Sequence, residues 1–340
     1  MKILLLADPF IPVPPLHYGG IERVVYDLAL KYAEMGHEVT LIAGPNSQSP
    51  SRLITYGANG ALNHKLDFKL LAQLYPILWK EIKNHDVIHN FGRLIFLAPF
   101  LKHRIKKVQT YMRYVGKKNI RYFDLIKPKN LVYTAVSNAI VSTGQTPNSH
   151  WETVYNCAPI DKYEFNADPG PDAYLAFLGR IERCKGLHNA ITVAKKTNKR
   201  LIVAGNIPYL KHELEYFENE IKPQFDDDQI KYIGVVNDEQ KNELLRNAAA
   251  LLSPIEWFEP FPIIIPEAFA CGTPVLGFKN GGLPEGIDQG VTGFISTNTE
   301  EMAEHVQNIP SLNRKTCREA AETRFSDTVI ANNYLDIYNS

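Results

Sequence analysis

The alternation of short apolar runs with longer helical patterns is the feature of this sequence that most constrains its fold. This alternation predicts βαβ units and parallel sheets, because strands that are buried on both faces read as continuous apolar runs. The predicted strands are residues 3–7, 39–43, 86–90, 108–111, 131–136, 174–178, 200–204, 230–233, 249–253 and 274–278. The clearest predicted helices are residues 21–35, 186–197, 209–222 and 238–247.

The pattern restarts near residue 170, after a segment rich in turn-forming residues, and 340 residues are enough for two domains of ordinary size. We therefore predict an α/β protein with two Rossmann-like, doubly wound domains, residues 1–165 and 170–322. A helical tail at residues 323–340 can cross back to the first domain. In such folds ligands bind beyond the carboxyl ends of the strands, so we expect a site in the cleft between the two domains.

The charge of the chain is zero overall but unevenly distributed. Residues 1–160 carry 19 Lys and Arg against 10 Asp and Glu, and residues 102–129 alone hold ten basic groups and one acid. Because aromatic residues lie among these cations, nucleic-acid binding is the first interpretation of this stretch. No run approaches the roughly 18–20 apolar residues of a membrane span, and the apolar run at the N-terminus is too short for a signal peptide. Together with four widely spaced cysteines, this leads us to expect a cytoplasmic protein.

A basic turn follows the first predicted strand of the second domain, in the segment GRIERCKG. A strand-to-helix turn presents unpaired amides at the positive end of the helix dipole, and Arg180 and Lys185 add two cations there. The combination suits a diphosphate. A solvated basic turn is the simpler alternative.

Two glutamates, Glu259 and Glu267, flank the start of a predicted helix in the segment EPFPIIIPE. Pro262 suits the first position of that helix, which would place Glu267 one to two turns into it. A glutamate there can accept two vicinal sugar hydroxyls. Alone, however, Glu267 is better explained as an acid favoured by the helix dipole.

Paired glycines, Gly19 and Gly20, follow the first strand and let the backbone approach a ligand closely. They form no GxGxxG pattern, and the chain has no P-loop. The Asp-rich segment 226–228 lies in a polar turn without an apolar strand leading into it, so we expect no metal site.

Together these motifs resemble the nucleotide-sugar-dependent, retaining glycosyltransferases of family 4, which have the GT-B fold. The resemblance is carried by FLGRIERCKG, EPFPIIIPE, AFACGTPV, GGLPEGI and GVTGF, and in the first domain by VPPLHYGGIERVVYDLA, GHEVTLIAG and DVIHNF. It implies transfer of a hexose from a nucleotide diphosphate sugar to an acceptor hydroxyl, in glycan or glycoconjugate synthesis, with no metal or other cofactor.

The resemblance also implies roles for individual residues. Arg180 and Lys185 would hold the donor diphosphate and stabilise the charge that develops as it leaves. Glu259 would lie at the donor sugar, and Glu267 would hold the nucleotide ribose. The other implied donor contacts are Gly19, Gly20, Val235, Phe261, Pro262, Ile263 and Ile264.

The acceptor is expected on loops of the first domain that contain Asp8, His17, Asn90 and Arg113. Family members often have a histidine where this chain has Met112, so a non-catalytic sugar-nucleotide-binding protein is one alternative. Another GT-B enzyme, such as an epimerase, is a second. With the resemblance, residues 102–129 change from a nucleic-acid site to a surface for an anionic polysaccharide, a phosphorylated lipid carrier or an acidic membrane leaflet, or to a solvated face.

Overall fold

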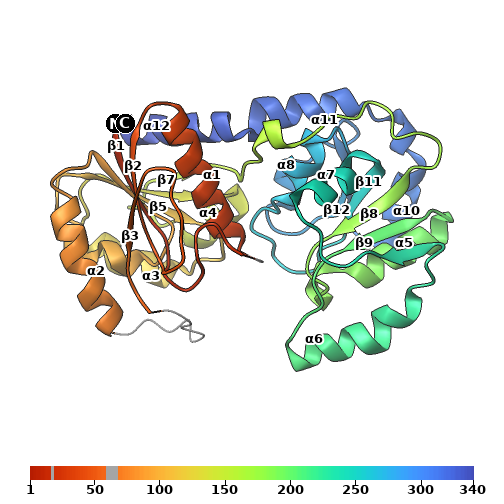
Figure 1. Cartoon of the computed structure of the whole chain (residues 1–340), viewed down its shortest axis with the longest axis horizontal. Coiled ribbons are helices and arrows are strands. Elements are labelled where there is room, and N and C mark those ends of the chain that lie inside the picture. The colour runs from red at the N-terminus through yellow and green to blue at the C-terminus, as the bar shows by residue number, and fades with distance from the viewer. Residues whose placement is uncertain (17–18, 59–67) are drawn as a thin grey trace. The chain divides into compact units, whose positions relative to one another are not determined.

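The computed structural model describes residues 1–16, 19–58 and 68–340, which form two compact units (Figure 1). Unit 1 comprises Met1–Cys157 and Asp327–Ser340, and unit 2 comprises Ala158–Ser326. Each unit is built around one sheet in which every strand pair is parallel. The predicted fold class, two doubly wound parallel sheets, is therefore confirmed.

The sheet of unit 1 has seven strands in the order β3-β2-β1-β4-β5-β6-β7. Its strands are β1 (Lys2–Leu6), β2 (Glu38–Ala43), β3 (Arg52–Thr55), β4 (Val87–Asn90), β5 (Lys106–Tyr111), β6 (Leu131–Ala135) and β7 (Trp151–Thr153). Its helices are α1 (Gly20–Glu34), α2 (Phe68–Glu81), η1 (Leu94–Phe100), α3 (Lys117–Leu125), α4 (Asn138–Gly144) and α12 (Asp327–Asn339). The strand order reverses between β1 and β4, and such a switch point is where doubly wound sheets bind ligands.

The sheet of unit 2 has six strands in the order β10-β9-β8-β11-β12-β13, with its switch point between β8 and β11. Its strands are β8 (Tyr174–Leu178), β9 (Leu201–Ala204), β10 (Ile230–Tyr232), β11 (Ala248–Ser253), β12 (Val275–Phe278) and β13 (Gly293–Ser296). Its main helices are α5 (Leu187–Thr197), α6 (Lys211–Tyr216), α7 (Asp238–Arg246), α8 (Ile264–Ala270), α9 (Leu283–Gly286), α10 (Thr299–Gln307) and α11 (Arg314–Ala320). Short 3₁₀ and π segments adjoin them: η2 (Ile160–Lys162), η3 (Arg183–Lys185), η4 (Phe217–Ile221), η5 (Lys222–Gln224), η6 (Ile309–Ser311) and η7 (Ala321–Phe325).

The segment between the units belongs to unit 2 from Ala158 onward, so the boundary lies before the predicted one at residues 165–170. Side chains and backbone in this segment bind to unit 2. The hydroxyl of Tyr163 donates to Glu267, and the backbone N–H of Glu164 donates to the side-chain oxygen of Asn242 at 3.0 Å. The turn-rich composition of residues 166–172 therefore marks a surface loop of unit 2.

Helix α12 is part of unit 1, although it ends the chain and unit 2 precedes it (Figure 1). The Nζ of Lys31 on α1 lies 3.0 Å from the carboxylate of Asp327, and the hydroxyl of Tyr338 lies 2.6 Å from Nδ1 of the buried His89. Burial holds the pKa of His89 well below its usual value, so this ring is a neutral hydrogen-bonding partner in the core. Of the tail expected at residues 323–340, Asp327–Ser340 belongs to unit 1 and residues 323–326 belong to unit 2.

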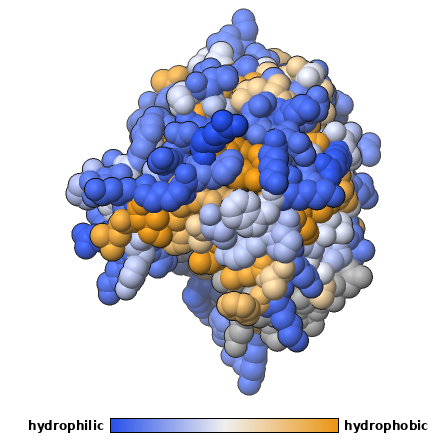
Figure 2. All heavy atoms as spheres, turned by 90° about the vertical axis from the view of Figure 1, so that its left-hand side faces the viewer, coloured by the Kyte–Doolittle hydropathy of each residue, from blue (hydrophilic) through white to orange (hydrophobic). Residues whose placement is uncertain are grey.

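No helix in the described part of the chain is long and apolar enough to cross a membrane. The face in Figure 2 shows hydrophobic patches between hydrophilic side chains. Surface hydrophobicity alone therefore does not single out a site on this face.

Candidate active site

The turn between β8 and α5 carries the two cations expected to hold a diphosphate, and it depends on one glycine. Gly186 has φ +75°, and a Cβ added there would lie 1.9 Å from the carbonyl oxygen of Pro254. Because this position is both left-handed and crowded, only glycine fits it. The close approach brings the turn against the loop that follows β11, where the N–H of Glu256 also donates to the carbonyl of Cys184 at 2.9 Å.

Lys185 and Glu259 meet where these two loops join. The Nζ of Lys185 lies 2.6 Å from Oε2 of Glu259, and Nε1 of Trp257 donates to the same oxygen at 2.6 Å. The ammonium group also lies 5.1 Å from the centroid of the Trp257 ring. Since β8 and β11 are neighbours at the switch point, the pair lies where a doubly wound sheet binds ligands.

Arg180, the second expected cation, pairs with Glu182 on the same turn. Both cations of the turn therefore have carboxylate partners. An anion that binds here must displace these carboxylates from the two cations or bind the cations alongside them.

Glu267 is a buried carboxylate held by two donors. Its Oε1 accepts a hydrogen bond from the hydroxyl of Tyr163 at 2.8 Å and one from Nζ of Lys241 at 2.6 Å. Burial, together with the neighbouring charge of Glu267, raises the pKa of Tyr163 well above its usual value, so the phenol keeps its proton and donates. Both donors fix one oxygen of the carboxylate.

Helix α8 begins two residues later than the sequence suggested. It starts at Ile264 with Ile263 as its N-cap, so Pro262 precedes the helix and Glu267 lies in its first turn. The prediction that Pro262 takes the first helical position is wrong, because Ile264 takes that position and Pro262 lies one residue before the N-cap. Phe261 is buried against Phe325, with ring centroids 5.6 Å apart, so only its backbone is available to a ligand.

The last predicted donor contact in unit 2, Val235, lies on a loop at the carboxyl end of a strand, and the glycine-rich loop after β12 lies at the same edge of the sheet. Val235 follows β10 and is 71% exposed. After β12, Gly281 has φ +57°, and a Cβ there would lie 2.1 Å from the carbonyl oxygen of Glu259. The N–H of Gly282 donates to that same oxygen at 2.8 Å, so this glycine-rich loop fixes the backbone of Glu259.

In unit 1 the paired glycines lie where α1 begins, with Gly20 as its first residue. A Cβ on Gly19 would lie 2.7 Å from Pro15 and 2.8 Å from the carboxylate of Glu22, so the position needs a glycine. Burial raises the pKa of the Glu22 carboxyl, which also feels the charges of Asp8 and Arg113. His17 lies outside the described residues.

The switch point of unit 1 carries a cavity of about 530 Å³. Its walls come from the loops after β1, β4 and β5 and from α3, and they include Asp8, Arg93, Met112 and Arg113. Asn90 does not line it. Its side chain instead donates to Gln109 at 2.6 Å and accepts from the N–H of Gly92 at 3.0 Å, so it shapes the loop that carries Arg93.

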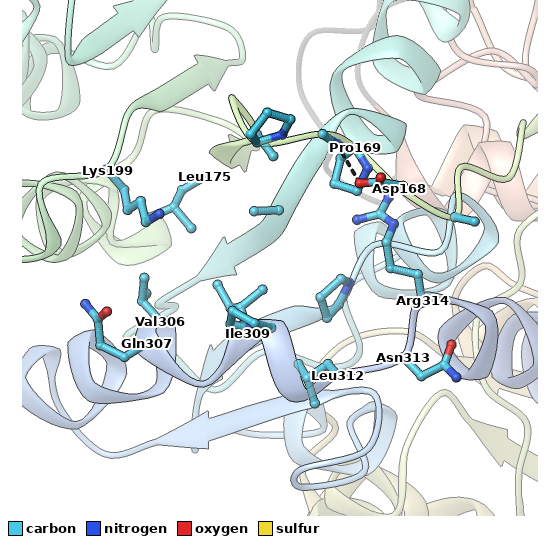
Figure 3. Close-up of a pocket in the computed structure, with 17 residues that line it drawn as sticks. Asp168, Pro169, Leu175, Lys199, Val306, Gln307, Ile309, Leu312, Asn313 and Arg314 are labelled. Atoms are coloured by element: carbon cyan, nitrogen blue, oxygen red, sulfur yellow. Dashed lines mark hydrogen bonds between the residues drawn. The ribbon is translucent and has the colours of Figure 1, made fainter.

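A second cavity, of about 640 Å³, lies in unit 2 at the amino ends of the strands (Figure 3). Leu175, Ala249 and Pro274 line it near the starts of β8, β11 and β12. Arg314 on its wall is held by the backbone carbonyls of Asn166, Ala248 and Arg246. This cavity is therefore separate from the donor-side residues, which follow the carboxyl ends.

Trp257, Tyr163 and Lys241 contact the expected site residues, although no motif in the sequence assigns them a role. Trp257 lies two residues before Glu259, just ahead of the segment EPFPIIIPE. Tyr163 and Lys241 are 104 and 26 residues away from Glu267 along the chain, so no local spacing indicates their contact with it.

Comparisons with known proteins agree with this architecture. The family model described as "Glycosyltransferase Family 4" matches residues 18–158, and the model "Glycosyl transferases group 1" matches residues 161–324. Two similar curated proteins are an "Uncharacterized 41.2 kDa protein in cps region" of Klebsiella pneumoniae and the "N-acetyl-alpha-D-glucosaminyl L-malate synthase" of Bacillus anthracis. The first is 24% identical over 95% of this chain and 97% of its own, and the second 23% over 94% and 93%.

A similar solved structure is that of Anabaena Alr3699/HepE in complex with UDP-glucose. It has a TM-score of 0.73 at 19% identity and covers 100% of this chain and 99% of its own. Two parallel-sheet units with switch-point sites, matched in this way over the whole chain, define a glycosyltransferase of the GT-B fold. The chain belongs to glycosyltransferase family 4, and the resemblance seen in the sequence is confirmed.

Proposed function

We propose that this glycosyltransferase moves a hexose from a nucleotide diphosphate sugar to an acceptor hydroxyl, with retention of configuration and without a metal ion. The observation that carries the proposal is the meeting of Lys185 with Glu259 at the switch point of unit 2. Cation and carboxylate there suit the two ends of such a donor, the diphosphate and the sugar hydroxyls.

The charge that forms on the leaving group explains how the cations of this turn would speed the reaction. Cleavage of the anomeric bond places negative charge on the diphosphate, and Lys185 and Arg180 lie on the turn where that charge would develop. An interaction that strengthens as the bond breaks lowers the barrier, because it stabilises the transition state more than the bound donor. The fixed cations thereby take the part that a metal ion has in other transferases.

Glu267 is suited to the ribose of the donor. Tyr163 and Lys241 both bind its Oε1, which leaves Oε2 to accept from vicinal hydroxyls. The relatives support a nucleotide-sugar donor, since the HepE structure contains UDP-glucose and the B. anthracis protein is named for an N-acetylglucosaminyl product.

The acceptor is assigned to the cavity of unit 1. Apolar and aromatic walls with a few charged groups are typical of a site for a small molecule. Asp8, Arg93 and Arg113 would orient the acceptor hydroxyl there. Asn90 acts indirectly, through the loop that carries Arg93.

A panel of nucleotide sugars, incubated with the protein in EDTA, tests the proposal. We expect one donor to release its nucleoside diphosphate, slowly to water or faster to an acceptor, and the product to keep the donor's anomeric configuration by proton NMR. Binding without release of nucleoside diphosphate from any donor would indicate the sugar-nucleotide-binding protein instead. Interconversion of the donor sugar would indicate an epimerase.

A further inference from the structure

Helix α3 presents cations and apolar side chains together on one exposed face. Lys118, Arg121, Tyr122 and Leu125 are spaced i, i+3, i+4 and i+7, so they share one side of the helix. The opposite side buries Ile120 and Asp124. We call the exposed set, with Ile126 after the helix, the α3 surface.

The apolar side chains of the α3 surface are largely exposed to solvent. Leu125 is 80% exposed, Tyr122 is 73% exposed and Ile126 is 46% exposed. A single exposed leucine is ordinary in a folded protein, but three such side chains within five residues form a patch. The chain thus places an apolar strip among cations on the outside of unit 1.

The charges around this strip have one sign. The exposed cations are Arg113, Lys117, Lys118, Arg121, Lys127 and Lys129. Asp124, the acid of this stretch, is buried and accepts a hydrogen bond from Thr146. In the part of the chain that the structure describes, none of these six cations forms a salt bridge with a carboxylate, although the charge of Arg113 also acts on Glu22.

The basic stretch seen in the sequence is in fact two groups. Lys107 is fully buried and donates to the carbonyls of His103 and Ile105, so it takes no part in any surface. Lys106 binds Ser340 at the amino end of β5. Arg113 and Lys117 lie beyond the carboxyl end of that strand, which is the edge that carries the cavity of unit 1.

The α3 surface and this cavity share the same helix. Asn119, Tyr122 and Phe123 of α3 line the cavity, and Arg113 and Tyr114 line it from the loop just before the helix. A molecule held at the α3 surface is therefore next to the mouth of the cavity.

We propose that the α3 surface docks unit 1 on a bilayer that contains anionic lipid, and that the acceptor is a lipid whose polar head enters the cavity from that bilayer. Cations and apolar side chains on one helical face are the combination that an interfacial helix uses, with the apolar tips in the head-group region and the cations at the lipid charges. The choice of acceptor rests on the proposed function of the cavity, whereas the docking does not.

Vesicle sedimentation of the whole protein tests the docking. We expect binding to vesicles of mixed phosphatidylcholine and phosphatidylglycerol, little binding to pure phosphatidylcholine, and release as salt rises because the attraction is screened. The triple variant Lys118→Gln, Arg121→Gln, Leu125→Ser should bind at least about 30-fold more weakly, since two cations at about 1 kcal/mol each account for that factor and the loss of Leu125 adds to it.

A matched control carries the same kind of changes on unit 2: Lys211→Gln, Lys315→Gln and Val291→Ser, at exposed positions. It should bind as the parent does. Equal loss in both variants, no preference for anionic vesicles, or release by millimolar inorganic phosphate would overturn the docking proposal. So would heparin binding by the parent without vesicle binding, since this assigns the surface to an anionic polymer.

Donor binding separates this proposal from the proposed function. The α3 variant should keep the parent's thermal shift with UDP or GDP, which also shows that it is folded. Vesicle binding by a protein that hydrolyses no donor would leave the docking intact and remove the transferase. Donor hydrolysis without vesicle binding would do the reverse. If the protein docks but transfers equally well to water-soluble and vesicle-bound acceptors, the lipid acceptor is wrong.

Discussion

Lys185 Nζ lies 2.6 Å from Glu259 Oε2, and this contact joins two loops that are 74 residues apart in the chain. The carboxylate neutralises the cation that we assign to the donor diphosphate. A diphosphate that binds here must therefore compete with Glu259 for Lys185, while a donor sugar gives Glu259 hydroxyl groups to bind in return.

This competition predicts opposite effects of Glu259→Gln on binding and turnover. The variant should bind UDP or GDP about fivefold more tightly, because a competing charge-assisted hydrogen bond worth ~1 kcal/mol to Lys185 is removed. Its transfer rate should fall by roughly two orders of magnitude, because the sugar contact is lost. Calorimetry measures the binding, and initial rates measure the transfer. The control is Glu256→Gln, at an exposed position three residues away, which should change neither quantity. Weaker diphosphate binding by Glu259→Gln would contradict the account.

Loss of the cation itself should slow the chemical step as well as weaken binding of the diphosphate. We expect Lys185→Ala to lower kcat by about 100-fold, as for other residues that stabilise transition-state charge. Lys211→Ala, at an exposed position on α6, should leave the rate unchanged. A Lys185→Ala protein with normal turnover would remove Lys185 from the reaction.

Tyr163→Phe tests how Glu267 is positioned. The variant removes one donor to Oε1, so we expect nucleotide binding to weaken about fivefold, the usual value of one hydrogen bond at ~1 kcal/mol. The effect should shrink with a 2′-deoxy nucleotide, because the carboxylate then has less of the ribose to hold. Calorimetry with both nucleotides forms a double-mutant cycle, and an equal loss for both would mean that Tyr163 is merely structural.

The central strands were predictable because they are buried on both faces. Residues Ile3 to Leu6 of β1 are all fully buried, so they read as one apolar run. The strands missed were β3, β7 and β13, and each is the edge strand of its sheet. β3 and β7 are short and partly exposed, so they lack that run, and β13 is mostly buried but only four residues long.

The candidate site was predictable only as far as its motifs are local. Lys185, Glu259 and Glu267 lie in contiguous segments with a recognisable pattern. Tyr163 and Lys241 reach Glu267 through the fold, and the burial of Asn90 behind Gly92 depends on packing between strands. Such contacts join residues from distant segments, so the pattern of one segment alone does not predict them.

Gly186→Ala should destabilise unit 2. The substitution places a Cβ 1.9 Å from the carbonyl of Pro254 in a left-handed residue, and strain of this kind costs about 1–3 kcal/mol or more. Urea unfolding measures the loss. Gly116→Ala is the matched control, since a Cβ there meets nothing within 4 Å, and it should change stability by less than ~1 kcal/mol. Equal stability of the two variants would mean that the turn relaxes freely.

Burial lowers the pKa of Lys107 to about 8 from 10.5, so stability should depend on pH in the alkaline range. Between these values the unfolded chain still holds a proton that the folded chain has released. The free energy of unfolding should therefore gain a contribution that rises with pH from about 8 to 10.5, by at most ~1.4 kcal/mol per unit. Denaturant unfolding at several pH values should show this slope reduced in Lys107→Met and unchanged in Lys118→Met.

The most direct test of the donor site is thermal stabilisation by nucleoside diphosphates. UDP or GDP in EDTA, at about 100 times its Kd, should stabilise the protein by about 2.7 kcal/mol and raise its Tm. Lys185→Ala and Glu267→Ala should each lose most of this shift, and Arg113→Ala in unit 1 should keep it. If no nucleoside diphosphate raises the Tm, or if the two unit 2 variants respond as the parent does, the donor site is not at the β8–β11 switch point.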